Sequence, residues 1–311
     1  MESEIFKRLI SPETGLPLRH INDKLITEDG NEIFQIHNGI ALLLRQDNLN
    51  KAKIHERDVF DRLPIQDVAY FRAILFHEII SKVNFIFKKN HTNCQKDLFA
   101  VEMGGGEGHW ARYFKKDVPY ATVFVCDLSM KTLERAPTDL KRVCADITRQ
   151  IFEKKSIRLA SFWVSLHHLG AEDRKNALKE VADALEEGGA LLIFEPNKLF
   201  LPRKILYRTR LSKDVYFDEK EQAIDFLEVS SIIKNSGLVE VGTCFINPPY
   251  NAEFIKKLKR WFIYMLAVEF LYQIDRWVLS PILGGIFYAR QSQLKKYLSL
   301  YGLAIYRKER I

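Results

Sequence analysis

The chain has 311 residues, of which 47% are hydrophobic and 28% charged, and its formal net charge is +7. This composition is typical of a globular protein with a substantial core and argues against a disordered or fibrous chain. The mild positive charge permits an anionic partner such as RNA, a phosphorylated metabolite or an acidic lipid, without requiring one. No apolar leader and no run of about 18 apolar residues is present, so we expect a cytoplasmic protein.

The first part of the chain is predicted to form two units. Residues 1–46 contain short apolar runs separated by Pro, Gly and Asp-Gly turns, which predicts a small β module. Residues 47–94 are predicted to be a linker followed by an amphipathic helix. The polar stretch RQDNLNKAKIHERD, residues 45–58, begins the linker, and the helical spacing starts near Pro64.

From residue 95 to 311 the chain alternates between strand and helix patterns. We expect strands near 98–103, 121–126, 142–145, 159–164 and 190–195, with helices near 108–116, 129–136, 172–186 and 222–236. Two last strands follow, at 238–246 and near the C-terminal end, and an insert at 251–297 separates them. This order predicts an α/β fold of the Rossmann-like, doubly wound type, with a mostly parallel seven-stranded sheet.

A glycine-rich turn, VEMGGGEGH, follows the first strand of this unit. Glycines at 104, 106 and 108 allow positive φ and a close approach of a ligand to the main chain. A dinucleotide fingerprint would place its third glycine one residue later, and the G-K-[ST] of a phosphate loop is absent. A glycine turn that serves the fold alone remains the alternative.

An aspartate stands at the tip of the next strand. Asp127 follows ATVFVC, about twenty residues after the glycine turn, where a carboxylate can accept hydrogen bonds from both hydroxyls of a ribose. The alternative is that Asp127 caps the following helix.

These motifs, with RVCADI at 142–147, FWVSLHHL at 162–169 and a Gly-Gly turn before the fifth strand, are found between residues 95 and 246. In this order they resemble the class I S-adenosylmethionine-dependent methyltransferases (type 11/12-like). The resemblance implies S-adenosyl-L-methionine as the cofactor. It also implies cofactor-binding roles for Glu102, Gly104, Gly106 and Gly108 at the amino-acid end, for Asp127 and Leu128 at the ribose, for Asp146 and Ile147 at the adenine, and for Trp163 and Ser165 beside the methyl donor.

Two histidines follow the fourth strand of this unit, at the expected rim of the site. His167 or His168 could act as the catalytic base for an acceptor that must lose a proton. The alternatives are helix capping and core packing, and the same alternatives apply to Glu195 and Asn197 after the fifth strand. Methyl transfer depends mainly on alignment, so no compact catalytic signature is expected.

Two appendages accompany this unit. The first 46 residues resemble a zinc-ribbon-like module, but Ser11 and Thr14 stand where cysteines would be, so we expect no metal there. The insert carries four basic residues at 256–260 followed by aromatic ones, which fits a cap over the acceptor pocket, a homodimer surface or peripheral membrane contact through 255–272.

The predicted function is methyl transfer to a small molecule or a glycan precursor, such as a sugar or sugar nucleotide. An RNA (rRNA or tRNA) methyltransferase is the first alternative, although the basic residues form no Arg-rich stripe. A non-catalytic scaffold or activator subunit with the same fold is the second alternative. It is disfavoured because the glycine turn and Asp127 are both present.

Overall fold

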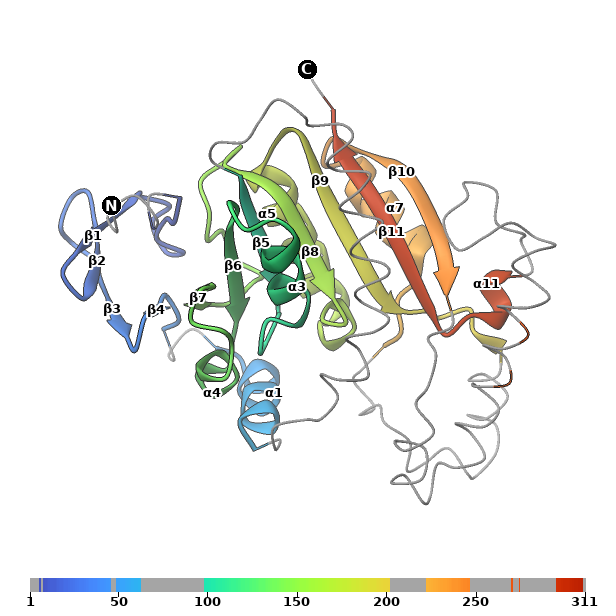
Figure 1. The fold of residues 1–311 in the computed structure, drawn as a ribbon, viewed down its shortest axis with the longest axis horizontal. Helices are drawn as coiled ribbons and strands as arrows, with labels where there is room; N and C mark the ends of the chain where they lie inside the picture. The colour runs from blue at the N-terminus through green and yellow to red at the C-terminus, as the bar shows by residue number, and fades with distance from the viewer. Residues whose placement is uncertain are drawn as a thin grey trace.

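A computed structural model describes residues 6, 8–45, 49–62, 98–201, 222–246, 270, 274 and 295–309. The helix predicted from Pro64 and nearly all of the insert at 251–297 lie outside the described residues, as does the predicted membrane contact at 255–272 apart from Phe270. The described strands form one sheet in the order β1-β2-β3-β4-β7-β6-β5-β8-β9-β11-β10 (Figure 1). Their bounds are β1 Leu18–Ile21, β2 Lys24–Thr27, β3 Ile33–His37, β4 Ile40–Leu42, β5 Phe99–Met103, β6 Thr122–Asp127, β7 Lys141–Cys144, β8 Ile157–Trp163, β9 Leu185–Pro196, β10 Leu238–Ile246 and β11 Tyr301–Lys308.

The seven strands β7-β6-β5-β8-β9-β11-β10 are the predicted doubly wound sheet. Strands β5 to β9 pair in parallel with one another, whereas β11 is antiparallel to both β9 and β10. The chain first adds β6 and β7 on one side of β5 and then β8 and β9 on the other, so the strand order reverses between β5 and β8. In open α/β sheets, ligands bind beyond the carboxyl ends of the strands at such a reversal. The predicted α/β fold is therefore confirmed.

Helices cover both faces of this sheet, as the alternating pattern of apolar residues requires. On one face, Trp110 and Phe114 of α3 (His109–Asp117) and Leu133 of α4 (Met130–Glu134) share one apolar cluster. On the other face, α5 (Ala171–Ala184) and α7 (Phe226–Lys234) pack against a second cluster (Figure 1). The remaining helical segments are α1 (Lys51–Arg62), the short η3 (Leu166–His168) and α11 (Lys295–Leu298).

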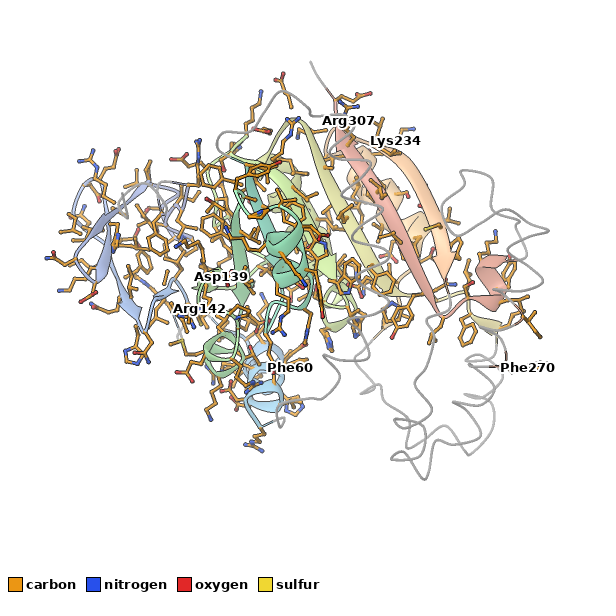
Figure 2. All side chains as sticks on the ribbon, viewed as in Figure 1. Phe60, Asp139, Arg142, Lys234, Phe270 and Arg307 are labelled. Atoms are coloured by element: carbon orange, nitrogen blue, oxygen red, sulfur yellow. The ribbon has the colours of Figure 1, made fainter. Side chains whose placement is uncertain are left out.

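The N-terminal strands extend the main sheet and share its core. β4 pairs in parallel with β7, and Arg142 of β7 donates to the Asn38 carbonyl oxygen at 2.6 Å where the two meet (Figure 2). Leu25 and Phe34, from β2 and β3, belong to the same apolar cluster as Phe152 of the main domain. Residues 8–45 are thus joined to the main domain by backbone pairing and by a common core.

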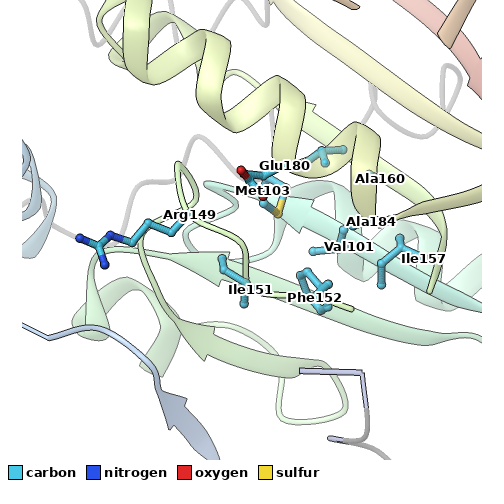
Figure 3. Close-up of a pocket in the computed structure, with 10 residues that line it drawn as sticks. Val101, Met103, Arg149, Ile151, Phe152, Ile157, Ala160, Glu180 and Ala184 are labelled. Atoms are coloured by element: carbon cyan, nitrogen blue, oxygen red, sulfur yellow. The ribbon is translucent and has the colours of Figure 1, made fainter. Parts of the chain in front are cut away.

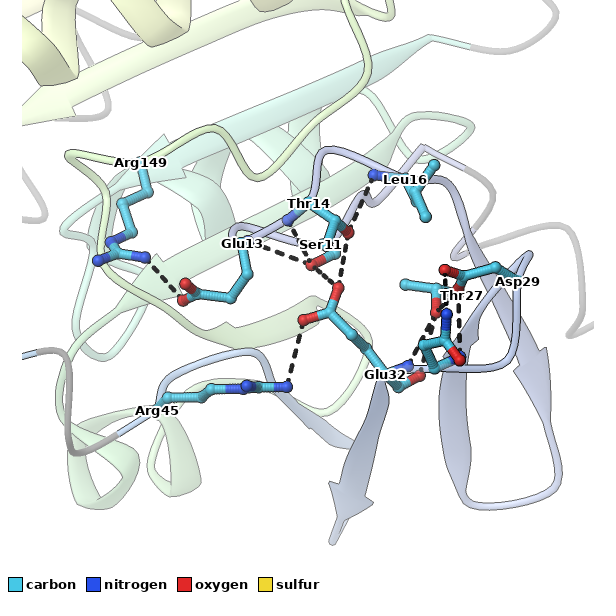
Figure 4. A network of polar contacts seen from close by, with 10 residues as sticks. Ser11, Glu13, Thr14, Leu16, Thr27, Asp29, Glu32, Arg45 and Arg149 are labelled. Carbon is cyan, nitrogen blue, oxygen red and sulfur yellow. Dashed lines mark hydrogen bonds and ion pairs between the residues drawn. The ribbon is translucent and has the colours of Figure 1, made fainter.

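A polar network holds the first turn of these N-terminal strands. The hydroxyls of Ser11 and Thr14 donate to one Glu32 carboxylate oxygen at 2.5 and 2.6 Å, and Arg45 pairs with the other at 3.2 Å (Figure 4). Hydrogen-bonded side chains therefore occupy the place where the zinc-ribbon resemblance would put metal ligands. Among the residues that the structure describes, no cluster of His, Cys, Asp or Glu could hold a metal ion.

The polar stretch predicted as a linker is in part a helix. α1 covers Lys51–Arg62, a mostly polar segment with no buried side chain, so it lacks the wide apolar face by which a packed helix is usually recognised. Asn50 accepts a hydrogen bond from the Lys53 main-chain N–H at 2.9 Å and so supplies an N-terminal cap. The helix is held by polar contacts with the main domain. No helix within the described ranges is long and apolar enough to cross a membrane.

Candidate functional site

The glycine turn between β5 and α3 lies at the carboxyl end of the sheet. Gly104, Gly106 and Gly108 have φ of 65°, 52° and 72°, in the left-handed region that favours glycine. At Gly104 space also matters, because a Cβ there would stand 2.8 Å from the Ser165 Cβ. The turn thus needs glycine for its backbone and for its packing against the loop that follows β8.

Glu102, in β5 directly before this turn, stabilises it. Its side chain is buried, and its carboxylate accepts hydrogen bonds from the main-chain N–H groups of Trp110 at 3.2 Å and Ala111 at 2.9 Å. Burial raises the pKa of Glu102 to about 8, and the two N–H groups oppose that rise. The side chain is therefore directed at the start of α3, where it fixes the turn to the helix.

Asp127 is positioned as the sequence predicts, at the tip of β6 beside the glycine turn. Its Oδ2 accepts from the Gly106 N–H at 2.8 Å, and its Oδ1 accepts from the Ser129 N–H at 2.8 Å. The N-cap of α4 is Ser129, whose hydroxyl accepts from the Thr132 N–H, so the capping alternative for Asp127 does not apply to this helix. Desolvation raises the pKa of the Asp127 carboxyl. Leu128 follows, and its carbonyl oxygen accepts from the Cys144 thiol at 3.5 Å.

Asp146 follows β7 at the same edge and has partners on both oxygens. Thr148 donates to its Oδ1 through the main-chain N–H at 3.0 Å and the hydroxyl at 2.8 Å, while Lys53 of α1 contacts its Oδ2 at 2.8 Å. Ile147, the next residue, is buried with a methyl group that would stand 3.4 Å from a Cβ on Gly104. The structure thus places the loops after β5, β6 and β7 together.

The loop after β8 brings a histidine onto a buried glutamate. His167 Nδ1 is 2.8 Å from Glu195 Oε2, and Glu195 Oε1 accepts from the main-chain N–H groups of Ser165 and Leu166 at 2.7 and 2.6 Å. Glu195 comes from the end of β9 and is fully buried. A carboxylate at Nδ1 selects one tautomer of a neutral imidazole and leaves Nε2 as its basic nitrogen.

The remaining predicted residues divide between the turn and the core. Ser165 donates its hydroxyl to the Met103 carbonyl oxygen at 2.8 Å, which ties the loop after β8 to the glycine turn. The Trp163 ring stacks on Phe194 at 4.5 Å inside an apolar cluster, so the structure gives it a packing role. Asn197 donates to the carbonyl oxygens of Lys296 and Ser299, which joins β9 to the segment before β11.

Sequence reasoning missed the contribution of α1. His168 Nδ1 pairs with Glu56 of this helix at 3.0 Å, and its ring meets the Phe60 ring edge-on at 5.2 Å. Asp61 accepts from the Ser129 hydroxyl at 2.5 Å. No signal in the sequence pairs these residues, because the contacts span at least 68 positions and involve no motif.

A small cavity lies between β5, β8 and α5, lined mostly by apolar side chains with Arg149 and Glu180 among them (Figure 3). It has room for about one water molecule, too little for a nucleoside. We therefore place the candidate site at the loops that follow β5 to β8.

Comparison with known proteins finds a family match for the segment that contains these loops. Residues 100–189, less than a third of the chain, match a family model described as "Methyltransferase domain". Proteins of this family bind S-adenosylmethionine. No curated protein matches the chain.

Solved structures are similar at a low level. A Haemonchus contortus phosphoethanolamine N-methyltransferase 2, in complex with phosphomonomethylethanolamine and S-adenosylhomocysteine, has 14% identity and a TM-score of 0.45, over 74% of this chain and 53% of that one. The present chain thus matches about half the length of that enzyme. A putative sarcosine dimethylglycine methyltransferase from Galdieria sulphuraria has 14% identity and a TM-score of 0.47, over 84% and 99%. Neither similarity indicates a substrate for this chain.

Proposed function

We propose that this protein is an S-adenosylmethionine-dependent methyltransferase that acts on a small molecule or a glycan precursor. The observation that carries the proposal is the glycine turn beside Asp127, at the strand-order reversal of a sheet that contains the matched methyltransferase domain. A turn with three positive-φ glycines exposes main chain where side chains would otherwise stand, and a carboxylate beside it suits a ribose.

The residues present fit this cofactor. Gly104, Gly106 and Gly108 would line its amino-acid end, with Glu102 acting through the turn that it supports. Asp127 and Leu128 would border the ribose, Asp146 and Ile147 the adenine, and Ser165 the side from which the methyl group leaves. Trp163, stacked on Phe194 in the core, would support that side from behind. Bound S-adenosylmethionine supplies a methyl group on a sulfonium, already joined to a good leaving group, so the protein has mainly to align the acceptor and exclude water.

His167 is the proposed base for an acceptor that carries a proton. Glu195 holds its Nδ1, so the proton of an acceptor hydroxyl or amine would pass to Nε2. His168, paired with Glu56, would border the acceptor from the side of α1. Glu195 itself accepts three hydrogen bonds and is a positioning residue.

The first test is calorimetric titration with S-adenosylmethionine and S-adenosylhomocysteine, with NAD as the control ligand. We expect binding to the wild type and a loss of about tenfold or more in affinity for Asp127→Asn, since a hydrogen bond to a charged group contributes about 1.5–3 kcal/mol. Asp139→Asn is the matched control, because Asp139 is exposed in the loop after α4 (Figure 2). A folded wild type that binds neither ligand would contradict the proposal and favour a scaffold.

The acceptor is then tested by transfer of a labelled methyl group to pools of sugar nucleotides, small amines and RNA. Transfer to a sugar nucleotide or another small molecule supports the proposal. Transfer to RNA alone would replace it with the RNA methyltransferase alternative, and a steep decrease of RNA binding with salt should then accompany the activity.

A further inference from the structure

The helix α1 lies across three of the loops that form the candidate site. Lys53 reaches the loop after β7 through Asp146, Asp61 reaches the loop after β6 through Ser129, and Glu56 reaches the turn after β8 through His168. In Figure 1, α1 lies beside α4 at the carboxyl ends of β6 and β7. Residues from a segment outside the sheet thus contact Asp146, Ser129 and His168 at that edge directly.

Lys53 makes the most enclosed of these contacts. Its ammonium group is 2.8 Å from Asp146 Oδ2, 2.8 Å from the Thr148 hydroxyl oxygen and 3.4 Å from Asp173 Oδ1. The side chains of Lys53 and Asp146 are 12% and 8% exposed. A pair shielded to this degree is weakened little by salt and holds its geometry better than an exposed pair.

The contacts leave Asp146 with a restricted capacity to accept hydrogen bonds. A carboxylate offers about four acceptor positions. Thr148 fills two of them on Oδ1 and Lys53 fills one on Oδ2, so about one position remains, on the oxygen that Lys53 holds in place. A group that meets this oxygen must be a donor.

We propose that Lys53 is a specificity-determining residue of the nucleoside pocket, which fixes Asp146 as an acceptor and thereby selects a 6-aminopurine over a 6-oxopurine. This inference rests on the proposed cofactor site. An exocyclic amino group donates to the remaining position, whereas a 6-oxo group brings a second acceptor against a shielded carboxylate. Sites built from polar groups discriminate strongly in this way, because the wrong ligand leaves them unpaired.

Without Lys53, Thr148 still holds Oδ1, but Oδ2 loses its partner and the carboxylate can rotate so that Oδ2 leaves the base. It would then neither accept from an amino group nor oppose an oxo group, so the affinity for the adenine nucleoside and the discrimination should both decrease. A lysine that only attached α1 to the domain would have a different effect. Its removal would weaken the binding of both nucleosides by the same factor, so the ratio of their affinities would not change.

The experiment measures affinity for S-adenosylhomocysteine and S-inosylhomocysteine by calorimetry. We expect the wild type to prefer the adenosyl compound by about tenfold or more, and Lys53→Met to lose most of this ratio through weaker adenosyl binding. Lys51→Met, on an exposed position of the same helix, should match the wild type. Glu56→Gln weakens the attachment of α1 without touching Asp146, so it should preserve the ratio.

Three outcomes would overturn the inference: a wild type that binds both compounds equally, a folded Lys53→Met with an unchanged ratio, or an equal loss for both compounds. Should Lys53→Met not fold, Lys53→Ala replaces it, because it removes the same ammonium group without an apolar side chain beside Asp146, and an unchanged ratio there would equally refute the inference. A folded wild type that binds neither compound contradicts the proposed function instead, so the two failures are distinguishable.

Discussion

Replacement of Gly104 by alanine should damage the fold and the candidate site together. The new Cβ would lie 2.8 Å from the Ser165 Cβ, at a residue whose φ of 65° disfavours any side chain. The left-handed conformation costs about 1–2 kcal/mol, and overpacking against a fixed neighbour costs about 1–3 kcal/mol. Ser165 is tied to the Met103 carbonyl oxygen and cannot retreat freely. We therefore expect Gly104→Ala to lower the free energy of unfolding by about 2–5 kcal/mol.

The assay is denaturant unfolding, followed by titration with S-adenosylhomocysteine under conditions where the variant remains folded. Two control glycines separate the cost of the left-handed backbone from the cost of overpacking. Gly30→Ala has φ of 73° with nothing within 4 Å of the new Cβ, so it should cost about 1–2 kcal/mol from the backbone alone. Gly170→Ala has φ of −60° and open space, so it should change stability by less than about 0.5 kcal/mol. The reasoning is refuted if Gly104→Ala costs no more than Gly30→Ala and leaves binding intact.

Two further predictions concern the support of the site and the N-terminal strands. Since the pKa of Glu102 is raised from 4.5 to about 8, its contribution to stability is fully present below pH 4.5 and is lost as pH rises through about 8. In that window, each pH unit lowers the free energy of unfolding of the wild type by up to about 1.4 kcal/mol. Glu102→Gln should therefore flatten the pH dependence of the free energy of unfolding. An unchanged pH profile would contradict the raised pKa of Glu102. Leu25→Ala should cost about 2–5 kcal/mol in a single unfolding transition, because Leu25 is fully buried in the shared core, whereas Ile21→Ala, 49% exposed, should cost less than about 0.5 kcal/mol. A separate early transition for Leu25→Ala would show that the N-terminal strands fold on their own.

The α/β order and the location of the glycine turn could be predicted from the sequence. Both follow from local signals, namely apolar runs that alternate with helical spacing and glycines that only a turn of this kind requires. The tip of β6 could be predicted for the same reason, since Asp127 follows the last residue of an apolar strand. The carboxyl ends of parallel strands meet at one edge, so the convergence of Asp127, Asp146 and His167 followed from the predicted topology.

The contacts of these side chains became known only from the folded structure. The position of α1 was hidden because most of its residues are polar and none is buried, and polar contacts with distant loops leave no period in the sequence. The merging of residues 8–45 with the main core was hidden for a related reason. A short apolar strand has the same pattern whether it packs within its own module or pairs with a strand a hundred residues away, as β4 does with β7. Local patterns determine which elements form, and long-range packing determines which of them share a site.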